Sequence, residues 1–339
     1  MSGAARYREA GVDLDAADAA QERIMQALAS ARGPLALGRI GAFGGMVRVP
    51  DDVPDPVLVL STDSVGTKVL VAIRAGVHDT VGEDLVNHSV NDILVHGARP
   101  IAFQDYIAAA TLVTETIAQL VEGVARGCRA HNMMLAGGET AQLPDLYHEG
   151  HYDLAGTVLG IVRRDKALHG DRARPGDILV GYAASGLHTN GYTLARRIVF
   201  GELGLDIDTH VEAIGATVGA ALLAVHRSYW VAIAPALDRV QGLAHITGGG
   251  IPGNLVRSLP DGCGAVVEAG AWEVPPLFRW LVEAGRVEFA ERYRVFNMGI
   301  GMIAAVRPGD VDAVRQAAGV LPTFVIGEVT SGAGVRVAP

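Results

Sequence analysis

The chain has 339 residues, of which 50% are hydrophobic and only 5% aromatic, and it contains 43 glycines. This length allows two domains with separate cores, and the composition is typical of α/β layers joined by tight turns, not of a sandwich or a disordered protein. The net charge of −9 argues against nucleic acid or an anionic membrane as a general partner, and the two cysteines, Cys128 and Cys263, support neither a disulfide framework nor a zinc site.

The first segment of the chain predicts a cytoplasmic protein that does not enter a membrane. Its N-terminal residues lack the apolar core of a signal peptide, and no apolar run reaches the length of a membrane span. A helix is predicted over about residues 16–31, and a glycine-rich loop follows over residues 38–45. Such a loop can bring the backbone of Gly44 to a phosphate, although a connector is its more common meaning.

Residues 61–68 read Ser-Thr-Asp-Ser-Val-Gly-Thr-Lys and directly follow a short apolar run. Asp63 supplies a carboxylate for a hard cation such as Mg²⁺. Gly66, Thr67 and Lys68 supply donors and a positive charge for phosphate oxygens. The segment is not a P-loop, because no G-x-x-x-x-G-K-[ST] motif occurs. By itself, an aspartate at a strand end is more often a turn former than a metal ligand.

The first half of the chain reads as alternating strands and helices. Thr80 and Glu83 form a predicted capping box at the start of one helix. On that helix Asp84, His88, Asn91 and Asp92 follow at i, i+4, i+7 and i+8, a single polar stripe. A solvated face explains most such stripes, but this one lacks Lys, Arg and Glu and favours an inward-facing ligand surface, with Asp92 as the cation ligand. The predicted strands cover about 57–61, 101–108, 133–136 and 152–162, and the helices cover 80–96 and 114–130.

A second unit is predicted after the polar segment 171–177, which contains a Pro-Gly turn. The fold class expected is α+β, with mixed α/β layers in two units, residues 1–170 and 171–339. Strands of the second unit are predicted near 178–184, 243–247, 265–268, 296–306 and 323–328, and helices near 192–200, 218–237, 276–284 and 310–318.

Three further glycine-rich segments carry polar residues after predicted strands. Glu139 and Thr140 follow Gly137-Gly138, and His188 and Asn190 lie where a loop meets a helix N-terminus, although a lone histidine there is usually a polar loop residue. Residues 248–253 match G-x-G-x-x-G, but Pro252 and Pro260 leave too little helix for a dinucleotide fold. His148-Glu149-Gly150-His151 is rejected as a zinc motif, because its histidines are only three residues apart.

Taken in order, these segments resemble the sequence motifs of a known enzyme family. Residues 61–68, Val90-Asn91-Asp92, residues 137–141, 187–192 and 244–250 all match phosphoribosylformylglycinamidine cyclo-ligases, also called aminoimidazole ribonucleotide synthetases. The resemblance extends from residues 7–13 to residues 296–302. It implies the two-domain fold of that family, with an N-terminal ATP-binding domain that dimerises through its sheet and a C-terminal α+β domain.

The resemblance also implies the reaction. ATP would phosphorylate the formyl amide oxygen of formylglycinamidine ribonucleotide, an amidine nitrogen would attack the activated carbon, and phosphate would leave as the imidazole ring closes. Asp63, Asp92 and Glu139 are the implied Mg²⁺ ligands, and Asp63, Lys68 and His188 the implied catalytic residues. The implied nucleotide-binding residues are Gly44, Gly66, Thr67, Lys68, Asn91, Asp92, Thr140, Asn190, Gly248 and Gly249.

Some features differ from the family pattern or fit its relatives. Met25 stands where many members have a lysine, so a nucleotide role of that lysine does not transfer to this chain. Other ATP-dependent enzymes of the same architecture, such as thiamine-phosphate kinase, selenophosphate synthetase and the hydrogenase maturation dehydratase, remain alternatives. So does a non-catalytic nucleotide-binding scaffold. Selenophosphate synthetase expects a reactive cysteine near its N-terminus, but the first cysteine here is Cys128. The hydrogenase maturation dehydratase expects a C-terminal cysteine, but this sequence ends at Pro339.

Overall fold

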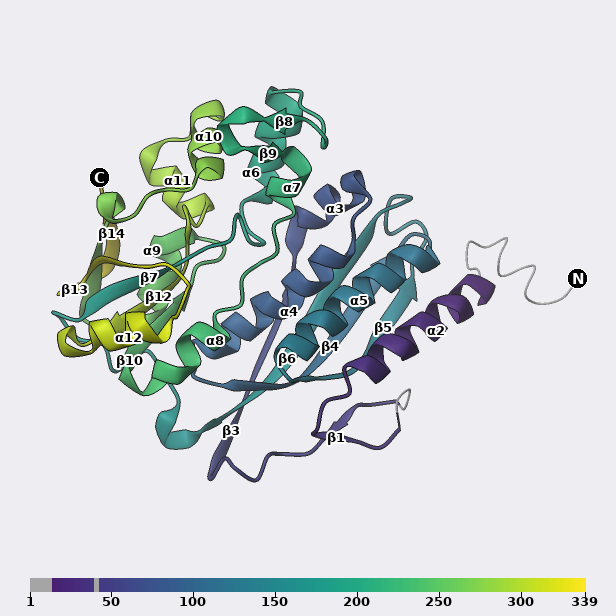
Figure 1. The fold of residues 1–339 in the computed structure, drawn as a ribbon, viewed down its shortest axis with the longest axis horizontal. Helices are drawn as coiled ribbons and strands as arrows, with labels where there is room; N and C mark the ends of the chain where they lie inside the picture. Colours follow the sequence, from purple (N-terminus) through teal and green to yellow (C-terminus); the bar gives the residue numbers. More distant parts are fainter. Residues whose placement is uncertain (1–13, 40–42) are drawn as a thin grey trace, which may run out of the picture.

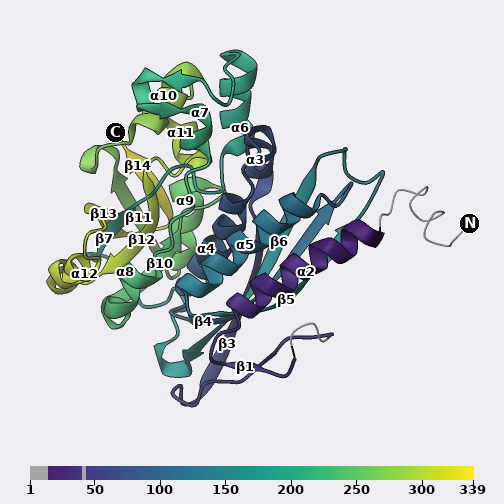
Figure 2. The same ribbon diagram turned by 45° about the vertical axis from the view of Figure 1, so that its right-hand side comes forward.

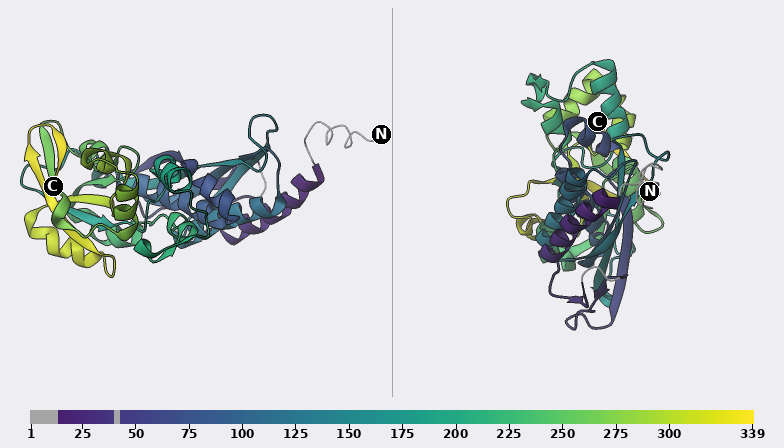
Figure 3. Two further views of the ribbon diagram at one scale, coloured as in Figure 1. Left: turned by 90° about the horizontal axis from the view of Figure 1, so that it is seen from above. Right: turned by 90° about the vertical axis from the view of Figure 1, so that its right-hand side faces the viewer.

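The structure, a computed structural model, describes residues 14–39 and 43–339. The chain forms two β-sheets with their helices, which lie at opposite ends of an elongated molecule (Figure 3). A four-stranded sheet is built from residues before 164, and a six-stranded sheet from residues after 177. The mixed α/β layers and the two-domain fold predicted from the sequence are therefore confirmed, whereas the division at residues 170 and 171 remains a prediction.

The N-terminal sheet has the order β3-β6-β4-β5. Strands β3 and β6 are antiparallel, β6 and β4 are antiparallel, and β4 and β5 are parallel, so β3, β4 and β5 all run in one direction. The carboxyl ends of these three strands therefore meet at one edge of the sheet. The strands are β3 (Pro56–Ser64), β4 (Arg99–Ala109), β5 (Met134–Gln142) and β6 (Tyr152–Arg163).

One face of this sheet is covered by helices α4 (Asp79–Leu94) and α5 (Thr114–Ala130), which pack side by side, and α2 (Leu14–Ser30) packs on α5 (Figures 1 and 2). Their apolar faces and the inward-facing residues of the strands form the N-terminal core. Within the described part of the chain, no helix covers the opposite face, where Leu58 and Leu60 on β3 are 49% and 66% exposed.

The C-terminal sheet has the order β10-β12-β7-β13-β11-β14, antiparallel except for the final pair. Helices α8 and α12 pack on one face around Tyr182 and Met302, while α9, α10 and α11 belong to the main core. The strands are β7 (Ile178–Ala183), β10 (Val240–His245), β11 (Cys263–Glu268), β12 (Ile300–Val306), β13 (Thr323–Ser331) and β14 (Gly334–Ala338). The helices are α6 (Tyr192–Arg196), α7 (Val218–Leu222), α8 (Trp230–Ile233), α9 (Gly250–Leu255), α10 (Pro276–Ala284), α11 (Phe289–Val295) and α12 (Val311–Ala317).

Short elements complete the described chain. Two-stranded pairs are formed by β1 (Ala36–Leu37) with β2 (Met46–Val47) and by β8 (His210–Val211) with β9 (Ala216–Thr217). A 3-10 turn over Gly66–Lys68 leads from β3 into α3 (Val69–Ala75). Residues 7–13 and 40–42, which belong to two segments of the sequence argument, lie outside the described residues. None of the described helices has the length and apolar character needed to cross a bilayer.

Two local predictions are wrong. Thr80 does not cap α4, because His78 occupies the N-cap and the buried Thr80 hydroxyl has no partner, while Glu83 pairs with Arg126. The single helix predicted over 218–237 is interrupted between α7 and α8, and the extended segment 223–229 passes along α4. This break places His226 and Tyr229, whose backbone N–H groups bond to side chains of α4, at the interface between the two domains.

Candidate functional site at the domain interface

The polar stripe of α4 faces the C-terminal domain, as an inward-facing ligand surface requires. Asp84 Oδ1 accepts the backbone N–H of His226 at 2.6 Å, and Asn91 Oδ1 accepts that of Tyr229 at 2.9 Å. These side chains replace the helical carbonyls as acceptors, which explains why the helix breaks there. Asn91 is fully buried and bonded to C-terminal backbone, so in this structure it joins the two domains, and its expected nucleotide contact stays a prediction.

Lys68 also lies elsewhere than its sequence pattern indicates. Its side chain is fully buried, with Nζ 2.7 Å from Asp84 Oδ2, and it donates to the carbonyl of Ala224 at 2.8 Å. Burial lowers the pKa of the Lys68 ammonium, and the Asp84 carboxylate opposes this shift. A long side chain at a buried turn satisfies its charge inside the protein when a carboxylate is in reach. In the conformation described this ammonium is buried against Asp84, and its expected role toward phosphate stays a prediction.

Two carboxylates, Asp63 at the end of β3 and Asp92 on α4, converge on His88. Nε2 of His88 lies 2.8 Å from Asp63 Oδ2 and 3.5 Å from Asp92 Oδ2, and Asp92 Oδ2 accepts the hydroxyl of Ser61 at 3.1 Å. Asp92 Oδ1 is 2.8 Å from Nδ1 of His245. Two of the three implied Mg²⁺ ligands, Asp63 and Asp92, are thus close to one another, and their Mg²⁺ role stays a prediction.

The charge states of these groups follow from their partners. Burial raises the pKa of Asp63, but the hydrogen bond and charge of His88 outweigh it, so the pKa lies below its ordinary value. Burial likewise acts against ionisation of Asp92, and the bond from His245 reverses the effect. For His88, burial lowers the pKa, but the bond to Asp63 and the nearby carboxylates raise it overall. Both aspartates are therefore ionised near neutral pH and able to hold a cation.

Asp63 and Asp92 open into a cavity of about 340 Å³ between the domains, here called the interdomain cavity. Its far wall comes from the C-terminal domain and carries one cation, Arg257, together with Thr247 and Asn254. Asp63 is 43% exposed and Asp92 22%, so oxygen lone pairs of both reach this space. Hard carboxylate oxygens at a solvent-connected cavity are the donors that Mg²⁺ prefers, and the site fits that ion.

Loops carrying several predicted nucleotide-binding residues lie at the same interface. The Thr67 hydroxyl is 3.2 Å from that of Thr193 on α6, and the Asn190 amide donates to Thr189 at 3.4 Å. The exposed Gly248 and Gly249 precede α9, and Asn254 holds their loop by donating to the carbonyl of Gly248 at 3.1 Å. Gly66 is exposed as well.

His188 is buried, and its expected role toward the substrate or the transferred phosphate stays a prediction. Its backbone φ is +63°, its Nε2 accepts the N–H of Ser185 at 3.2 Å, and its ring stacks on His226 with centroids 4.0 Å apart. Gly301 is required beneath it, because a Cβ there would collide with the His188 ring and the Tyr229 hydroxyl. In this conformation His188 supports the cluster and lines neither cavity.

A second cavity, of about 600 Å³, lies between α2, the glycine-rich loop and β5, and is here called the α2–β5 cavity. It contains Gly44, Glu139, Thr140 and the uncharged Met25. Residues 137–140 lie within β5, because that strand continues to Gln142, so they do not follow a strand as predicted. Three strand spacings separate β3 from β5, or about 14 Å. Glu139 is therefore too far from Asp63 to share one Mg²⁺ with it inside a single chain.

Asp105 on β4 points into the α2–β5 cavity and was missed by sequence reasoning. Burial raises its pKa to about 7, and among the described residues only a backbone hydrogen bond of Asp105 itself acts against this rise. Gly138 is needed opposite it, because the carboxylate occupies the space of a Cβ. An acid next to Gln104 inside the otherwise apolar segment 101–108 was the available signal. His226 was missed too, and no local pattern could have found it, since its position depends on the break in the predicted helix.

Comparisons with known proteins place this geometry in context. Residues 44–162 match the family model of the N-terminal domain of AIR synthase related proteins, and residues 174–338 match that of the C-terminal domain. A phosphoribosylformylglycinamidine cyclo-ligase of Sorangium cellulosum is 47% identical over 331 residues, covering 96% of this chain and 95% of that protein. The chloroplastic/mitochondrial enzyme of that name in Vigna unguiculata is 42% identical and covers 97% of this chain and 82% of its own.

Solved structures show the same fold. Thiamine-monophosphate kinase from Stenotrophomonas maltophilia superimposes with a TM-score of 0.68 at 21% identity, covering 94% of this chain and 95% of that one. E. coli HypE gives 0.67 at 20% identity, covering 94% and 92%. At such identities the likeness concerns the fold and says nothing of the reaction.

Proposed function

The chain belongs to the phosphoribosylformylglycinamidine cyclo-ligase family, and from this premise we propose that the interdomain cavity is where its reaction takes place. As an enzyme of that family it closes formylglycinamidine ribonucleotide to aminoimidazole ribonucleotide, with ATP converted to ADP and phosphate, in purine biosynthesis. The observation that carries the proposal is the pair of ionised carboxylates, Asp63 and Asp92, facing Arg257 across one cavity.

Each part of this cavity meets a requirement of phosphoryl transfer followed by ring closure. An amide oxygen is a poor leaving group, and transfer of the γ-phosphoryl group converts it into phosphate, which leaves with that oxygen when the amidine nitrogen attacks and loses a proton. Asp63 and Asp92 would hold Mg²⁺, which neutralises phosphate charge when bound. Arg257 supplies positive charge on the opposite wall. Catalysis at such a site is mainly positioning and charge stabilisation.

The remaining predicted residues fit this proposal in two groups. Gly66, Thr67, Asn190, Gly248 and Gly249 lie on loops at the interface and would contribute donors to the phosphates. ATP use is in keeping with the related fold of HypE, which has been solved in complex with ATP. Gly44, Glu139 and Thr140 belong to the α2–β5 cavity, so we propose that they bind nucleotide there and meet an active site only across a dimer.

We propose a homodimer formed through the uncovered face of the N-terminal sheet. Leu58 and Leu60 on β3 expose 49% and 66% of their surface, and Tyr106 on β4, two strands away in the same sheet, exposes 37%, an apolar area that a second copy would bury. Leu60→Asp should therefore yield monomers by light scattering, whereas Val320→Asp, at an exposed apolar residue of the other domain, should leave the mass unchanged. A wild-type monomer at micromolar concentration would contradict the proposal.

A cytoplasmic location is proposed as well. Among the described residues both cysteines, Cys128 and Cys263, are free thiols, which suits a reducing compartment.

The reaction is tested with purified protein, ATP and formylglycinamidine ribonucleotide, by measuring ADP and the aminoimidazole product together. Thiamine phosphate serves as the alternative acceptor. We expect product only with the ribonucleotide. Asp92→Asn should lower turnover at least about 100-fold, because a Mg²⁺-binding charge is lost, while the exposed Glu283→Gln should retain wild-type activity. ADP release with thiamine phosphate alone would overturn the assignment, and an active Asp92→Asn variant would overturn the location.

A further inference from the structure

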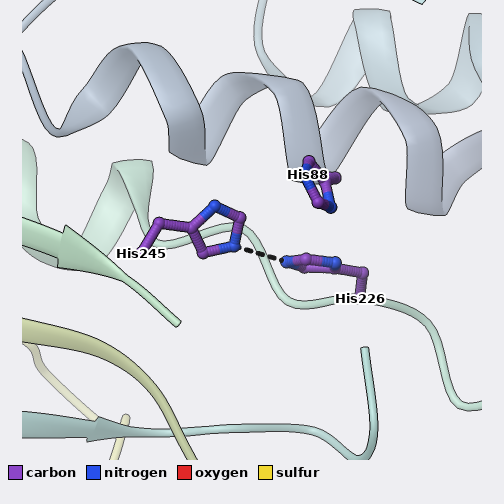
Figure 4. Close-up of side chains that lie close together, drawn as sticks. All are labelled: His88, His226 and His245. Carbon is purple, nitrogen blue, oxygen red and sulfur yellow. Dashed lines mark hydrogen bonds between the residues drawn. The ribbon is translucent and has the colours of Figure 1, made fainter. Parts of the chain in front are cut away.

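Three buried imidazoles from both domains meet beside the interdomain cavity. His88 comes from α4, His226 from the extended segment between α7 and α8, and His245 from the end of β10 (Figure 4). Their exposed fractions are 2%, 0% and 6%, and one ring nitrogen of each lies within 4.8 Å of those of the other two. Nothing in the proposed ring closure requires His226, which does not line the cavity.

His226 and His245 direct their Nε2 atoms toward each other. Asp92 Oδ1 lies 2.8 Å from Nδ1 of His245, so in the neutral ring the proton is on Nδ1 and the lone pair on Nε2. Asn91 directs its amide nitrogen toward Nε2 of His226 at 3.2 Å, since its oxygen is occupied by the N–H of Tyr229. The two Nε2 atoms are 3.1 Å apart and share a hydrogen bond (Figure 4). An ion that replaced the shared proton would meet two imidazole nitrogens that already point toward one another.

The surroundings match those of a histidine metal site. Two nitrogens bound to one tetrahedral ion at about 2.0–2.1 Å are about 3.3 Å apart, close to the separation of these Nε2 atoms. Carboxylates commonly orient metal-binding imidazoles through the second ring nitrogen. Asp92 stands in that relation to His245, and Asp63 contacts the ring of His88 at 2.8 Å.

We propose that His88, His226 and His245 bind a divalent transition-metal ion of the Zn²⁺ or Co²⁺ class, which joins the two domains. Neutral imidazole nitrogens prefer these ions to Mg²⁺, so the site is chemically separate from the carboxylate oxygens that face the cavity. One ligand comes from the N-terminal domain and two from the C-terminal domain. The bound ion therefore fixes the distance between α4 and the extended segment, and with it the positions of Asp63 and Asp92.

The test uses the full-length protein after treatment with a chelator, without ATP or ribonucleotide. Titration with Co²⁺ should saturate at one ion per chain and give the visible absorption of a nitrogen-bound ion, and Zn²⁺ should displace it. His226→Gln should weaken binding at least about tenfold, as loss of a metal-orienting or metal-binding group does. Bound Zn²⁺ should raise the midpoint of thermal unfolding of the wild type but not of this variant.

Matched variants make each outcome decisive. His148→Gln removes one ring of a surface histidine pair whose centroids are 5.6 Å apart, and it should bind Co²⁺ as the wild type does. His88→Gln gives the same test from the other domain if His226→Gln does not fold. Absence of stoichiometric binding would overturn the proposal, as would binding that survives both His226→Gln and His88→Gln or is lost in His148→Gln. Because no catalysis is measured, these outcomes are independent of the proposed function.

Discussion

Asp63 and Asp105 occupy the same row of the N-terminal sheet and have opposite charge preferences. Asp63 on β3 is paired with Gly156 on β6, which is paired in turn with Asp105 on β4, so the two carboxylates are two strand spacings, or about 10 Å, apart. The pKa of Asp63 is held below its ordinary value by His88, whereas burial raises that of Asp105 to about 7.

The difference comes from the partner, not from the strand. Both acids are near the helix-covered side of the sheet, but α4 presents His88 and Asp92 to Asp63, and the neighbourhood of Asp105 presents no side-chain donor among the described residues. A buried carboxylate stays ionised only where hydrogen bonds and opposite charge offset desolvation. The interdomain cavity therefore holds ionised carboxylates that suit a cation, whereas Asp105 has no close charged partner, although Arg32 and Arg39 line the same α2–β5 cavity.

The largest effect is expected when a buried acid loses its charged partner and becomes unpaired, as Asp105 is. Lys68→Met leaves Asp84 buried without its counter-ion and should lower the free energy of unfolding by about 3–5 kcal/mol. The double variant Lys68→Met/Asp84→Asn should recover a large part of that loss, because the amide oxygen can still accept the N–H of His226. Denaturant unfolding of both variants gives the values. A Lys68→Met protein of wild-type stability that handles ATP poorly would return the ammonium to the phosphate site.

The next effect concerns catalysis by the paired acid. Asp63→Asn should lower ATP-dependent turnover about 100-fold, equivalent to about 2.7 kcal/mol, because the cation-binding charge is removed while the hydrogen bond to His88 can be kept. Steady-state rates at saturating substrates measure it. The exposed Asp312→Asn on α12 is the control and should be fully active. Near-normal turnover in a folded Asp63→Asn enzyme would remove this residue from the active site.

Asp105, the unpaired acid, should make the free energy of unfolding depend on pH. Because the folded-state pKa of Asp105 is about 7 and its unfolded value 3.8, the stabilisation from its bound proton is complete below about pH 4 and is lost as the pH rises through 7. The free energy of unfolding of Asp105→Asn, taken relative to that of the wild type, should therefore rise by about 1–2 kcal/mol between pH 4 and 8. This figure allows for water in the cavity. Unfolding measured across that range tests this, with the exposed Asp261→Asn as control. A difference that does not change with pH would contradict it.

The smallest effect tests an unpaired hydroxyl. Thr80→Val removes a buried group that makes no hydrogen bond, so stability should stay the same or rise by less than about 1 kcal/mol. Thr217 does cap a helix, since it accepts the N–H of Ala220 at 3.2 Å, and Thr217→Val should cost about 1 kcal/mol. Chemical unfolding of the two variants side by side separates these cases. An equal loss in both would restore the predicted capping box.

Several predicted elements of the first unit agree with the structure because they depend on local patterns, whereas β5 continues to Gln142, beyond its predicted end. Strand β6 has the predicted start at Tyr152, and α5 has the predicted limits of Thr114 and Ala130. The polar stripe on α4 was also readable, since side chains four residues apart share one helix face. Its departure from a solvated surface was signalled by the absence of Lys, Arg and Glu.

The sequence alone determined the fold class and the family, and it offered Asp63 and Asp92 among three candidate Mg²⁺ ligands. What only the tertiary structure decided was where long-range partners lie. Lys68 turns inward because Asp84 is within reach of its ammonium, and the helix predicted over 218–237 breaks because acceptors on α4 compete for its backbone donors. Glu139 is separated from Asp63 by the strand order of the sheet, a property that periodicity along the chain does not contain.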